Sequence, residues 1–216
     1  MAEGGCFLAL EGGEGAGKTT QAALLGAWLD GLGVEHVLAR EPGGTEVGEA
    51  VRSLVLGRTD LDVPPRSELF LILAARAAFV DRLVRPALES GAVVVADRFA
   101  LSTLAYQGYG RGLPLDEIRD ANRVATGHLA PDLYLVLDVE VARGADRQRR
   151  QGKEPDRMEG AGEAFLERVR RGYLELARRE PNVRVLSGEG SPEEVHRRIR
   201  RLLQAELPET FGAAAV

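Results

Sequence analysis

One short stretch of this chain carries residue types that bind a run of phosphates. It matches the pattern G-x-x-x-x-G-K-[ST] and reads Gly12-Gly13-Glu14-Gly15-Ala16-Gly17-Lys18-Thr19. Glycines let the backbone curl so that its N–H groups point at phosphate oxygens, and a following helix adds the partial positive charge of its N-terminus. Lys18 is expected to reach the β- and γ-phosphates of a nucleotide, and the Thr19 hydroxyl to ligate Mg²⁺.

The composition indicates that the lysine in this stretch is required. The chain has 28 basic residues, and Lys18 and Lys153 are its only lysines. A lysine ammonium is a compact point charge, whereas an arginine guanidinium is a planar fork, so the two are not interchangeable. A chain that uses arginine almost everywhere else therefore favours a working phosphate loop here over a chance glycine-rich turn.

The loop lies between a strand pattern and a helix pattern, and the same alternation continues along the chain. Apolar runs predict strands at residues 6–10, 34–40, 92–96, 133–139 and 183–186. Helical patterns occupy residues 18–32, 47–57, 67–89, 100–107, 114–126, 140–151, 164–180 and 192–206. The alternation predicts an α/β fold, a doubly wound parallel five-stranded sheet with helices on both faces. We expect a single domain over residues 1–216 with a loose tail at 207–216.

The carboxyl ends of parallel strands meet at one edge of the sheet, where ligands bind. Loops with functional residue types follow the first three predicted strands there, at residues 11–19, 40–46 and 97–99. Asp97 ends an apolar run, as would an acid that holds Mg²⁺ directly or through water; by itself it could equally be a solvated aspartate. Arg98 beside it is placed to clamp a phosphate through two hydrogen bonds, the alternative being a surface ion pair.

Two further features have both a functional and a structural interpretation. Glu14 lies inside the phosphate loop, where a carboxylate would repel phosphates unless it faces an acceptor or solvent. A basic run near residue 147 has Arg143, Arg147 and Arg150 on one helical face. Such a run is either a solvated face or part of a mobile lid, at about residues 143–160, that brings positive charge to a transferring phosphoryl group.

Charge and composition exclude several other classes of protein. The net charge is −5 and the isoelectric point about 5.4, so a general nucleic-acid-binding surface is not expected. The single cysteine, Cys6, excludes an internal disulfide and a cysteine-cluster metal site. No apolar run approaches the ~18 residues that span a bilayer, and no signal peptide precedes the first strand. We therefore expect a cytoplasmic protein that binds no membrane.

Four motifs together resemble those of bacterial thymidylate kinases, which are P-loop nucleoside monophosphate kinases. The motifs are E-G-x-x-G-A-G-K-T-T-Q at 11–21, R-E-P-G-G-T at 40–45, D-R-F-x-x-S-x-x-A-Y-Q-G at 97–108 and D-R-M-E at 156–159. The phosphate loop alone is generic, but the other three are specific and stand in the family's order. The resemblance implies a P-loop kinase fold and transfer of the γ-phosphate of ATP to dTMP, with Mg²⁺, giving dTDP and ADP for dTTP synthesis. It also implies a homodimer formed through the long helices.

The resemblance further implies roles for individual residues. ATP would be held by Gly12, Gly13, Glu14, Gly15, Ala16, Gly17, Lys18, Thr19, Thr20 and Arg147. Mg²⁺ would be held by Thr19 and Asp97. The acceptor dTMP would be bound by Arg40, Glu41, Pro42, Phe70, Arg76, Asp97, Arg98, Ser102, Tyr106 and Gln107. Catalytic roles would fall to Glu14, Lys18, Arg98, Arg149 and Arg157.

Some of these implied roles are specific. Arg98 would bridge the donor and acceptor phosphates, and Tyr106 would crowd the position of a ribose 2′-hydroxyl. Phe70 would stack on the thymine, although residues 69–73 by themselves have the pattern of a helix core. Gly15 stands where one variant of the family carries an arginine, so the lid is expected to supply the catalytic charge. A one-residue insertion near Lys153 leaves open which basic residue of the lid reaches the phosphates.

Other functions remain open from the sequence. A kinase for another nucleotide or for a deoxynucleoside is the nearest alternative, although Arg40, Arg76 and Arg98 favour an acceptor that already bears phosphate. A P-loop ATPase switch is a second alternative. The guanine signature Asn-Lys-x-Asp of such switches is absent, because neither asparagine, Asn122 or Asn182, precedes a lysine. A structural protein with an inactive loop is disfavoured by the intact phosphate-loop motif.

Overall fold

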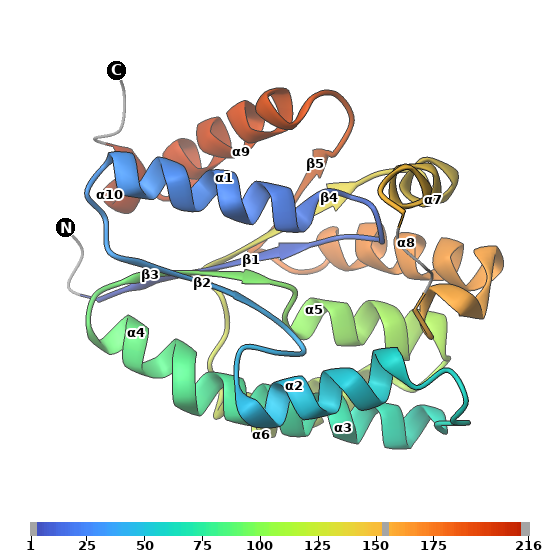
Figure 1. Cartoon of the computed structure of the whole chain (residues 1–216). Helices are drawn as coiled ribbons and strands as arrows, with labels where there is room; N and C mark the ends of the chain where they lie inside the picture. The colour runs from blue at the N-terminus through green and yellow to red at the C-terminus, as the bar shows by residue number, and fades with distance from the viewer. Residues whose placement is uncertain (1–3, 153–155, 213–216) are drawn as a thin grey trace.

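The computed structural model describes residues 4–152 and 156–212, and its centre is a five-stranded sheet (Figure 1). The strands are β1 (Cys6–Glu11), β2 (His36–Arg40), β3 (Val93–Asp97), β4 (Leu133–Asp138) and β5 (Val183–Ser187). Their spatial order is β2-β3-β1-β4-β5, and each neighbouring pair runs parallel. The carboxyl ends of the strands therefore share one edge, and the predicted parallel α/β fold is confirmed.

The side chains of the central strand β1 alternate between two separate cores, as the period of a strand requires. Leu8 and Leu10 pack in one core with α1 (Lys18–Gly31) and α9 (Pro192–Glu206), whereas Phe7 packs in the other. All of β1 is buried, because helices cover both faces of the sheet (Figure 1). Burial on both faces explains why the sequence of the strand is a continuous apolar run rather than an alternating one.

A larger group of helical segments lies on the side of the second face, some of them packed on other helices rather than on the sheet. These are α2 (Glu46–Arg52), η1 (Ser53–Gly57), α3 (Pro65–Phe79), η2 (Val80–Val84), α4 (Arg85–Glu89), α5 (Ala100–Thr103), η3 (Leu104–Gly110), α6 (Leu115–Thr126) and α8 (Glu163–Ala177). Segments η1, η2 and η3 are π-helical stretches that continue the preceding α-helix. Between β4 and α8 the chain forms α7 (Val141–Arg150) and the short 3₁₀-helix η4 (Glu159–Ala161).

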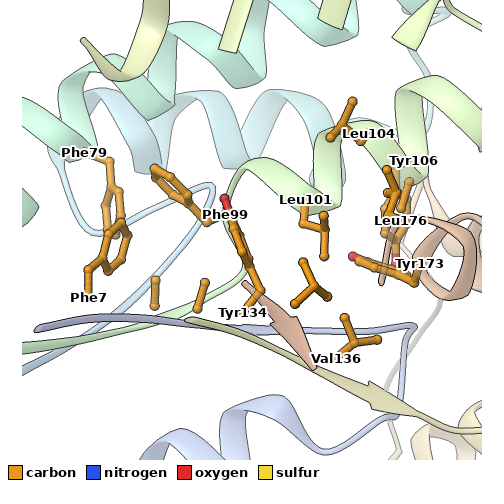
Figure 2. Packing of buried hydrophobic residues seen from close by; sticks show 14 of the residues in the cluster. Phe7, Phe79, Phe99, Leu101, Leu104, Tyr106, Tyr134, Val136, Tyr173 and Leu176 are labelled. Atoms are coloured by element: carbon orange, nitrogen blue, oxygen red, sulfur yellow. The ribbon is translucent and has the colours of Figure 1, made fainter. Parts of the chain in front are cut away.

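An aromatic cluster in the second core holds the chain just after β3. Phe99 lies edge-on to Phe7 with 4.9 Å between the ring centroids, and Phe79 packs on the same ring at 6.3 Å (Figure 2). Phe99 is fully buried and directly follows Asp97 and Arg98. The packing of this ring therefore holds the backbone that presents two of the predicted site residues.

The end of the described chain packs on the domain, in contrast to the loose tail predicted from residue 207. Residues 208–211 form α10 (Pro208–Phe211), and Phe211 is only 1% exposed. Its ring stacks on Trp28 of α1, with the centroids 5.6 Å apart. A helix this short leaves almost no pattern in a sequence, and burial of one aromatic ring is what holds it. The rest of the predicted tail, 213–216, lies outside the described residues.

Replacing Phe211 by alanine should therefore destabilise the protein. The change removes a buried ring and leaves a cavity against Trp28, so the free energy of unfolding should fall by about 3–5 kcal/mol in urea denaturation. Glu209→Ala in the same short helix alters an exposed side chain and should change that free energy by no more than about 0.5 kcal/mol. Equal stability of the two variants would contradict this packing and would support the loose tail predicted from the sequence.

Candidate active site

The loop between β1 and α1 has the shape that a phosphate-binding loop requires. Gly12, Gly15 and Gly17 have φ angles of 130°, 67° and 94°, a region that favours glycine. Lys18 begins α1, and its Nζ donates to the carbonyl oxygens of Gly12 at 3.2 Å and Gly13 at 2.8 Å. The lysine is thus drawn over the loop rather than extended into solvent.

The surroundings of Lys18 favour an anion. Its side chain is buried, with 7% of the residue exposed. Burial first, and then the charge of Arg98, lower the pKa of the Lys18 ammonium, against the opposite pull of Glu14 and Asp97. A buried cation with too little negative charge around it gains Coulomb attraction when an anion arrives. The loop is therefore electrostatically suited to a polyphosphate.

The two residues predicted to hold Mg²⁺ are in direct contact. Thr19 Oγ1 donates to Asp97 Oδ2 at 2.6 Å, which joins the start of α1 to the end of β3. Hydroxyl and carboxylate oxygens suit Mg²⁺, which keeps several waters and substrate oxygens in its coordination shell. Within residues 4–152 and 156–212 no group of three His, Cys, Asp or Glu side chains could hold a metal. An ion held by Thr19 and Asp97 would thus need further oxygens from water and substrate.

A large cavity opens in front of the loop and gathers most of the residues predicted to bind a nucleotide. The predicted residues that line it are Glu14, Gly15, Ala16, Gly17, Lys18, Thr19, Thr20, Arg40, Glu41, Asp97, Arg98 and Arg147. Gly188 and Gly190 after β5, and Pro192 at the start of α9, complete the wall. The cavity lies at the carboxyl ends of the strands, the edge where parallel sheets bind their ligands.

Helix α7 packs directly on the phosphate loop through two glycines. A Cβ placed on Gly15 would lie 2.2 Å from the carbonyl oxygen of Gly144, and a Cβ on Gly144 would lie 2.3 Å from that of Glu14. Arg147, one turn further along α7, donates to the carbonyl oxygens of Gly15 at 3.3 Å and Gly188 at 3.0 Å. This close approach requires glycine at position 15 and sets Arg147 at the rim of the large cavity.

A second cavity adjoins the first. The predicted residues in its wall are Glu14, Glu41, Pro42, Arg76, Arg98, Ser102, Tyr106 and Gln107. Both cavities are lined by Glu14, Glu41, Arg52 and Arg98. Molecules bound in the two cavities would therefore meet at these charged side chains.

Arg98 lies at this junction and is held on several sides. Its Nη1 donates to the carbonyl oxygen of Gly12 at 3.0 Å, its Nη2 donates to the Tyr106 hydroxyl at 3.1 Å, and it pairs with Glu14. Although burial opposes the charged form, the Glu14 carboxylate raises the pKa of Arg98 well above its usual value. The φ angle of 78° is uncommon for a residue other than glycine, which marks Arg98 as a candidate functional residue.

A buried carboxylate behind Arg98 supports this conformation. Glu11 ends β1 and is 0% exposed. It accepts hydrogen bonds from the amides of Phe99 at 2.9 Å and Ser102 at 3.2 Å, and from the Tyr173 hydroxyl at 3.0 Å. Burial raises the pKa of Glu11, and Ser102 and Arg98 act against that shift. The sequence signal for this role is an acid that closes a buried strand.

Arg76 has a different position from Arg98. It is 1% exposed, and it pairs with Glu41 through Nε–Oε2 at 2.9 Å and Nη2–Oε2 at 2.6 Å. Its Nη1 donates to Thr103 at 2.6 Å and also to Asn122. Because protein acceptors take most of its donors, Arg76 serves the second cavity by fixing Glu41 in the wall.

The prediction that Phe70 stacks on a base is wrong for this structure. Phe70 is 64% exposed and lines neither of the two cavities, whereas Ile72 is 7% exposed and lines the second. Successive helix positions are about 100° apart, so a shift of two residues turns a side chain to the opposite face. The apolar wall at this place is therefore aliphatic, and it is completed by Val55 and Leu56.

Two predicted catalytic arginines also lie away from the cavities. Arg149 is exposed and pairs with an aspartate of its own helix, because it is two positions, about 200°, from Arg147. Arg157 pairs with the buried Glu68. Neither arginine lines either of the two cavities in this structure, so the catalytic assignment of both stays a prediction. Lys153, where the insertion was placed, is outside the described residues.

Sequence reasoning missed part of the second cavity, namely Arg52, Val55, Leu56, Ile72, Thr103, Asp156 and Met158. Arg52 stands out because it lines both cavities and its Nη1 donates to the carbonyl oxygen of Pro42 at 3.0 Å. Burial, and then the nearby charge of Arg40, lower the pKa of Arg52. Like Lys18, it is a cation with room for an anion beside it. No local motif signals this role, since an arginine on a short helix is ordinarily solvated.

The close contact at Gly144 predicts that alanine at this position lowers the free energy of unfolding, although alanine has the higher helix propensity. Gly144→Ala should gain up to about 1 kcal/mol of helix propensity but must push α7 off the phosphate loop, for a net loss of about 1–3 kcal/mol of unfolding free energy. Gly31→Ala is the matched control, since a Cβ there has no atom within 4 Å. Urea denaturation should show the control at or above wild-type stability. A stabilised Gly144→Ala variant would contradict the contact.

Comparison with known proteins groups this arrangement with one family. The family model described as thymidylate kinase matches residues 10–199. The thymidylate kinase of Symbiobacterium thermophilum is 44% identical over 211 residues, covering 96% of this chain and 97% of that protein. That of Pseudomonas putida is 45% identical over 202 residues, covering 94% and 96%. A crystal structure of thymidylate kinase from Ehrlichia chaffeensis matches with a TM-score of 0.77 and 32% identity, over 93% of this chain and 100% of that chain. The chain therefore belongs to the thymidylate kinase family.

Proposed function

We propose that the chain transfers the γ-phosphate of ATP to dTMP, giving dTDP and ADP. It is an ATP-dependent nucleoside monophosphate kinase of the thymidylate kinase family. The observation that carries the proposal is the junction at Arg98, where the cavity in front of the phosphate loop adjoins a second cavity and Glu14, Glu41, Arg52 and Arg98 line both. Donor and acceptor would bind in these adjacent cavities, with their phosphates meeting at the shared side chains.

On the donor side, the loop amides and Lys18 would hold the β- and γ-phosphates of ATP. Thr19 and Asp97 would hold Mg²⁺, which supplies positive charge to neutralise these phosphates. Arg147 bridges the loop and the turn at Gly188, so it would lie against the bound nucleotide. The contact of α7 with the loop supports this assignment, because it places Arg147 at the rim of the donor cavity.

On the acceptor side, Arg98 and Arg52 would bind the phosphate of dTMP, since a guanidinium matches two phosphate oxygens at once. Arg98 also lies 5.1 Å from the centroid of the Tyr106 ring, which helps to hold its plane. Glu14 is turned toward Tyr106 Oη at 2.9 Å and toward Arg98, so its carboxylate faces the acceptor side rather than the loop phosphates. Pro42 would border the base.

Catalysis would rest on positioning and charge neutralisation, with no covalent enzyme intermediate. Side chains held before the substrates arrive stabilise developing charge without reorganisation at the moment of reaction. We further propose that residues 143–160 act as a mobile lid over the donor cavity. Closure would exclude water and so suppress hydrolysis of ATP.

The second cavity favours a phosphorylated acceptor over a nucleoside. Arg52 and Arg98 both line it, and although Arg98 already pairs with Glu14, a neutral nucleoside would bring no negative charge to either guanidinium. A P-loop switch would hydrolyse ATP in response to a protein partner and would need no second cavity. The second cavity, which shares four charged residues with the donor cavity, therefore supports a kinase more than a switch.

We also propose a single-domain homodimer located in the cytoplasm. Exposed apolar side chains occur on the packed helices α2, α3 and α6, with Val47 51%, Phe70 64% and Val124 82% exposed (Figure 1). Such side chains on neighbouring helices are typical of a subunit interface. Sedimentation equilibrium should give twice the chain mass of 23.3 kDa. Over the described part of the chain, no helix is both long and apolar enough to cross a membrane.

The function is tested by supplying Mg²⁺–ATP with dTMP, dUMP, thymidine or no acceptor and measuring ADP and the phosphorylated product. We expect dTDP from dTMP, and much slower release of ADP without an acceptor. Phosphorylation of thymidine in preference to dTMP would indicate a deoxynucleoside kinase. Hydrolysis that outpaces transfer would contradict a kinase altogether.

Lys18 should be indispensable for this transfer. Lys18→Ala should lower kcat/KM for ATP by about 10²–10³-fold, or roughly 3–4 kcal/mol, because a charge aimed at the transferring phosphoryl group is lost. Lys18→Arg should lose most of the activity too, since a planar fork does not reproduce the compact point charge of the ammonium beside the loop carbonyls. Arg58→Ala, which alters a 52% exposed side chain outside both cavities, is the control. Near-normal turnover of Lys18→Ala would show that Lys18 does not have the role assigned to it.

Ile72 and Phe70 form a matched pair for the acceptor site. Ile72→Ala should raise KM for dTMP about tenfold, since it removes part of the aliphatic wall at ~25 cal/mol per Å² of apolar contact. Phe70→Ala should leave KM for dTMP unchanged because Phe70 lies on the other face of α3. Steady-state kinetics at saturating ATP distinguishes the two. If Phe70→Ala raised KM for dTMP and Ile72→Ala did not, the result would support stacking of Phe70 on the base.

A further inference from the structure

A tyrosine outside the predicted motifs contacts the residues at the junction of the two cavities. Tyr173 lies on α8 and is fully buried. Its hydroxyl donates to Glu11 Oε2 at 3.0 Å and lies 2.8 Å from Ser102 Oγ. Arg98 Nη1 donates to the same hydroxyl oxygen at 3.2 Å. Tyr173 therefore stands between a buried carboxylate and the guanidinium that is predicted to bridge the two phosphates.

Close packing of α8 on η3 brings the hydroxyl of Tyr173 to this place. A Cβ on Gly172 would lie 2.7 Å from the ring of Tyr109 on η3, so only glycine allows the two segments to approach this closely. The rings of Tyr173 and Tyr106 lie edge to face with their centroids 6.3 Å apart (Figure 2). The Tyr106 hydroxyl accepts from Arg98 Nη2 at 3.1 Å. The packing of these two segments thus sets one hydroxyl against each terminal nitrogen of the same guanidinium.

The hydroxyl of Tyr173 acts as a neutral group that both donates and accepts. Burial first, and then the charge of Glu11, raise the pKa of Tyr173 well above its usual value, against the opposite effect of Arg98. A neutral phenol has one proton to donate and lone pairs with which to accept. With its proton directed at Glu11, the oxygen accepts from Arg98, and the bonds form a chain from the carboxylate through the hydroxyl to the guanidinium. Such a chain lets a buried carboxylate orient a guanidinium through an intermediate group.

The contacts of Arg98 differ in whether they face substrate. Its Nη2 bonds to Tyr106 and pairs with Glu14, and both of these residues line the second cavity. Their contacts with Arg98 would compete with an incoming acceptor. Its Nη1 donates to the carbonyl oxygen of Gly12 and to Tyr173, which lines neither of the two cavities. The bond from Nη1 to Tyr173 therefore does not compete with an acceptor for space.

We propose that Tyr173 is a positioning residue for phosphoryl transfer, whose hydroxyl holds the plane of the Arg98 guanidinium at the junction of the two cavities. The inference rests on the proposed function, since it takes Arg98 as the group that bridges the donor and acceptor phosphates. A guanidinium fixed before the substrates arrive stabilises developing charge without reorganisation. Loss of the hydroxyl leaves Arg98 charged but free to rotate, so that substrates still bind while transfer slows.

The test uses Tyr173→Phe, which removes one hydroxyl oxygen and keeps the buried ring. Glu11 still accepts from the amides of Phe99 and Ser102, so the variant should fold and unfold cooperatively in urea. With saturating Mg²⁺–ATP and dTMP, kcat for dTDP formation should fall about 10- to 30-fold, the size expected for one hydrogen bond to a charged group. KM for ATP should stay within about twofold of wild type, because Tyr173 does not line the donor cavity.

Tyr109→Phe is the matched control, because it removes the same atom from a half-buried tyrosine that also packs on α8 and lines neither of the two cavities. It should keep wild-type kcat. In an Arg98→Lys background, Tyr173→Phe should lower kcat by less than about twofold, since the group that it positions is already lost. Wild-type kcat in Tyr173→Phe, equal losses in the two tyrosine variants, or a full further loss in the Arg98→Lys background would overturn the inference. A wild-type protein that forms no dTDP would instead overturn the proposed function.

Discussion

The whole site depends on the hydrogen bonds made to one carboxylate that is buried at the end of the central strand. Glu11 lies where β1 meets the phosphate loop, and its carboxylate takes donors from the chain after β3 and from Tyr173 of α8. Because an unsatisfied carboxylate in this position would cost several kcal/mol, these segments are held at one place. The same hydrogen bonds set the backbone beside Arg98, and so they put a guanidinium at the junction of the two cavities.

The pairing of buried charges separates supporting residues from those that face substrate. Arg76 with Glu41, and Arg157 with Glu68, have partners within the protein and shape the walls. The pKa values of Lys18 and Arg52 are lowered, by burial first, and both line a cavity. A phosphate would supply the negative charge that these two cations lack, and groups already fixed in place need little reorganisation to stabilise it.

Most of the fold could be predicted because its signals are local. The strands and helices follow from periodicity, and the observed strands lie within one or two residues of the expected ones. The misplacement of Phe70 was an error of helical phase. Residues 69–73 are continuously apolar, so the sequence pattern does not distinguish the cavity-facing Ile72 from the exposed Phe70. In the same way, a run of arginines on α7 does not show which of them faces the loop until the helix is packed.

The sequence by itself determined the elements whose physics acts over a few neighbouring residues. The glycines, the lysine and the helix start of the phosphate loop are of this kind, as is the acid and arginine pair at the end of β3. Only the tertiary structure decided which charges are buried together and which face a cavity. Glu11, Arg52 and Glu68 acquired their roles in that way, because burial and pairing depend on segments that lie tens of residues apart in the chain.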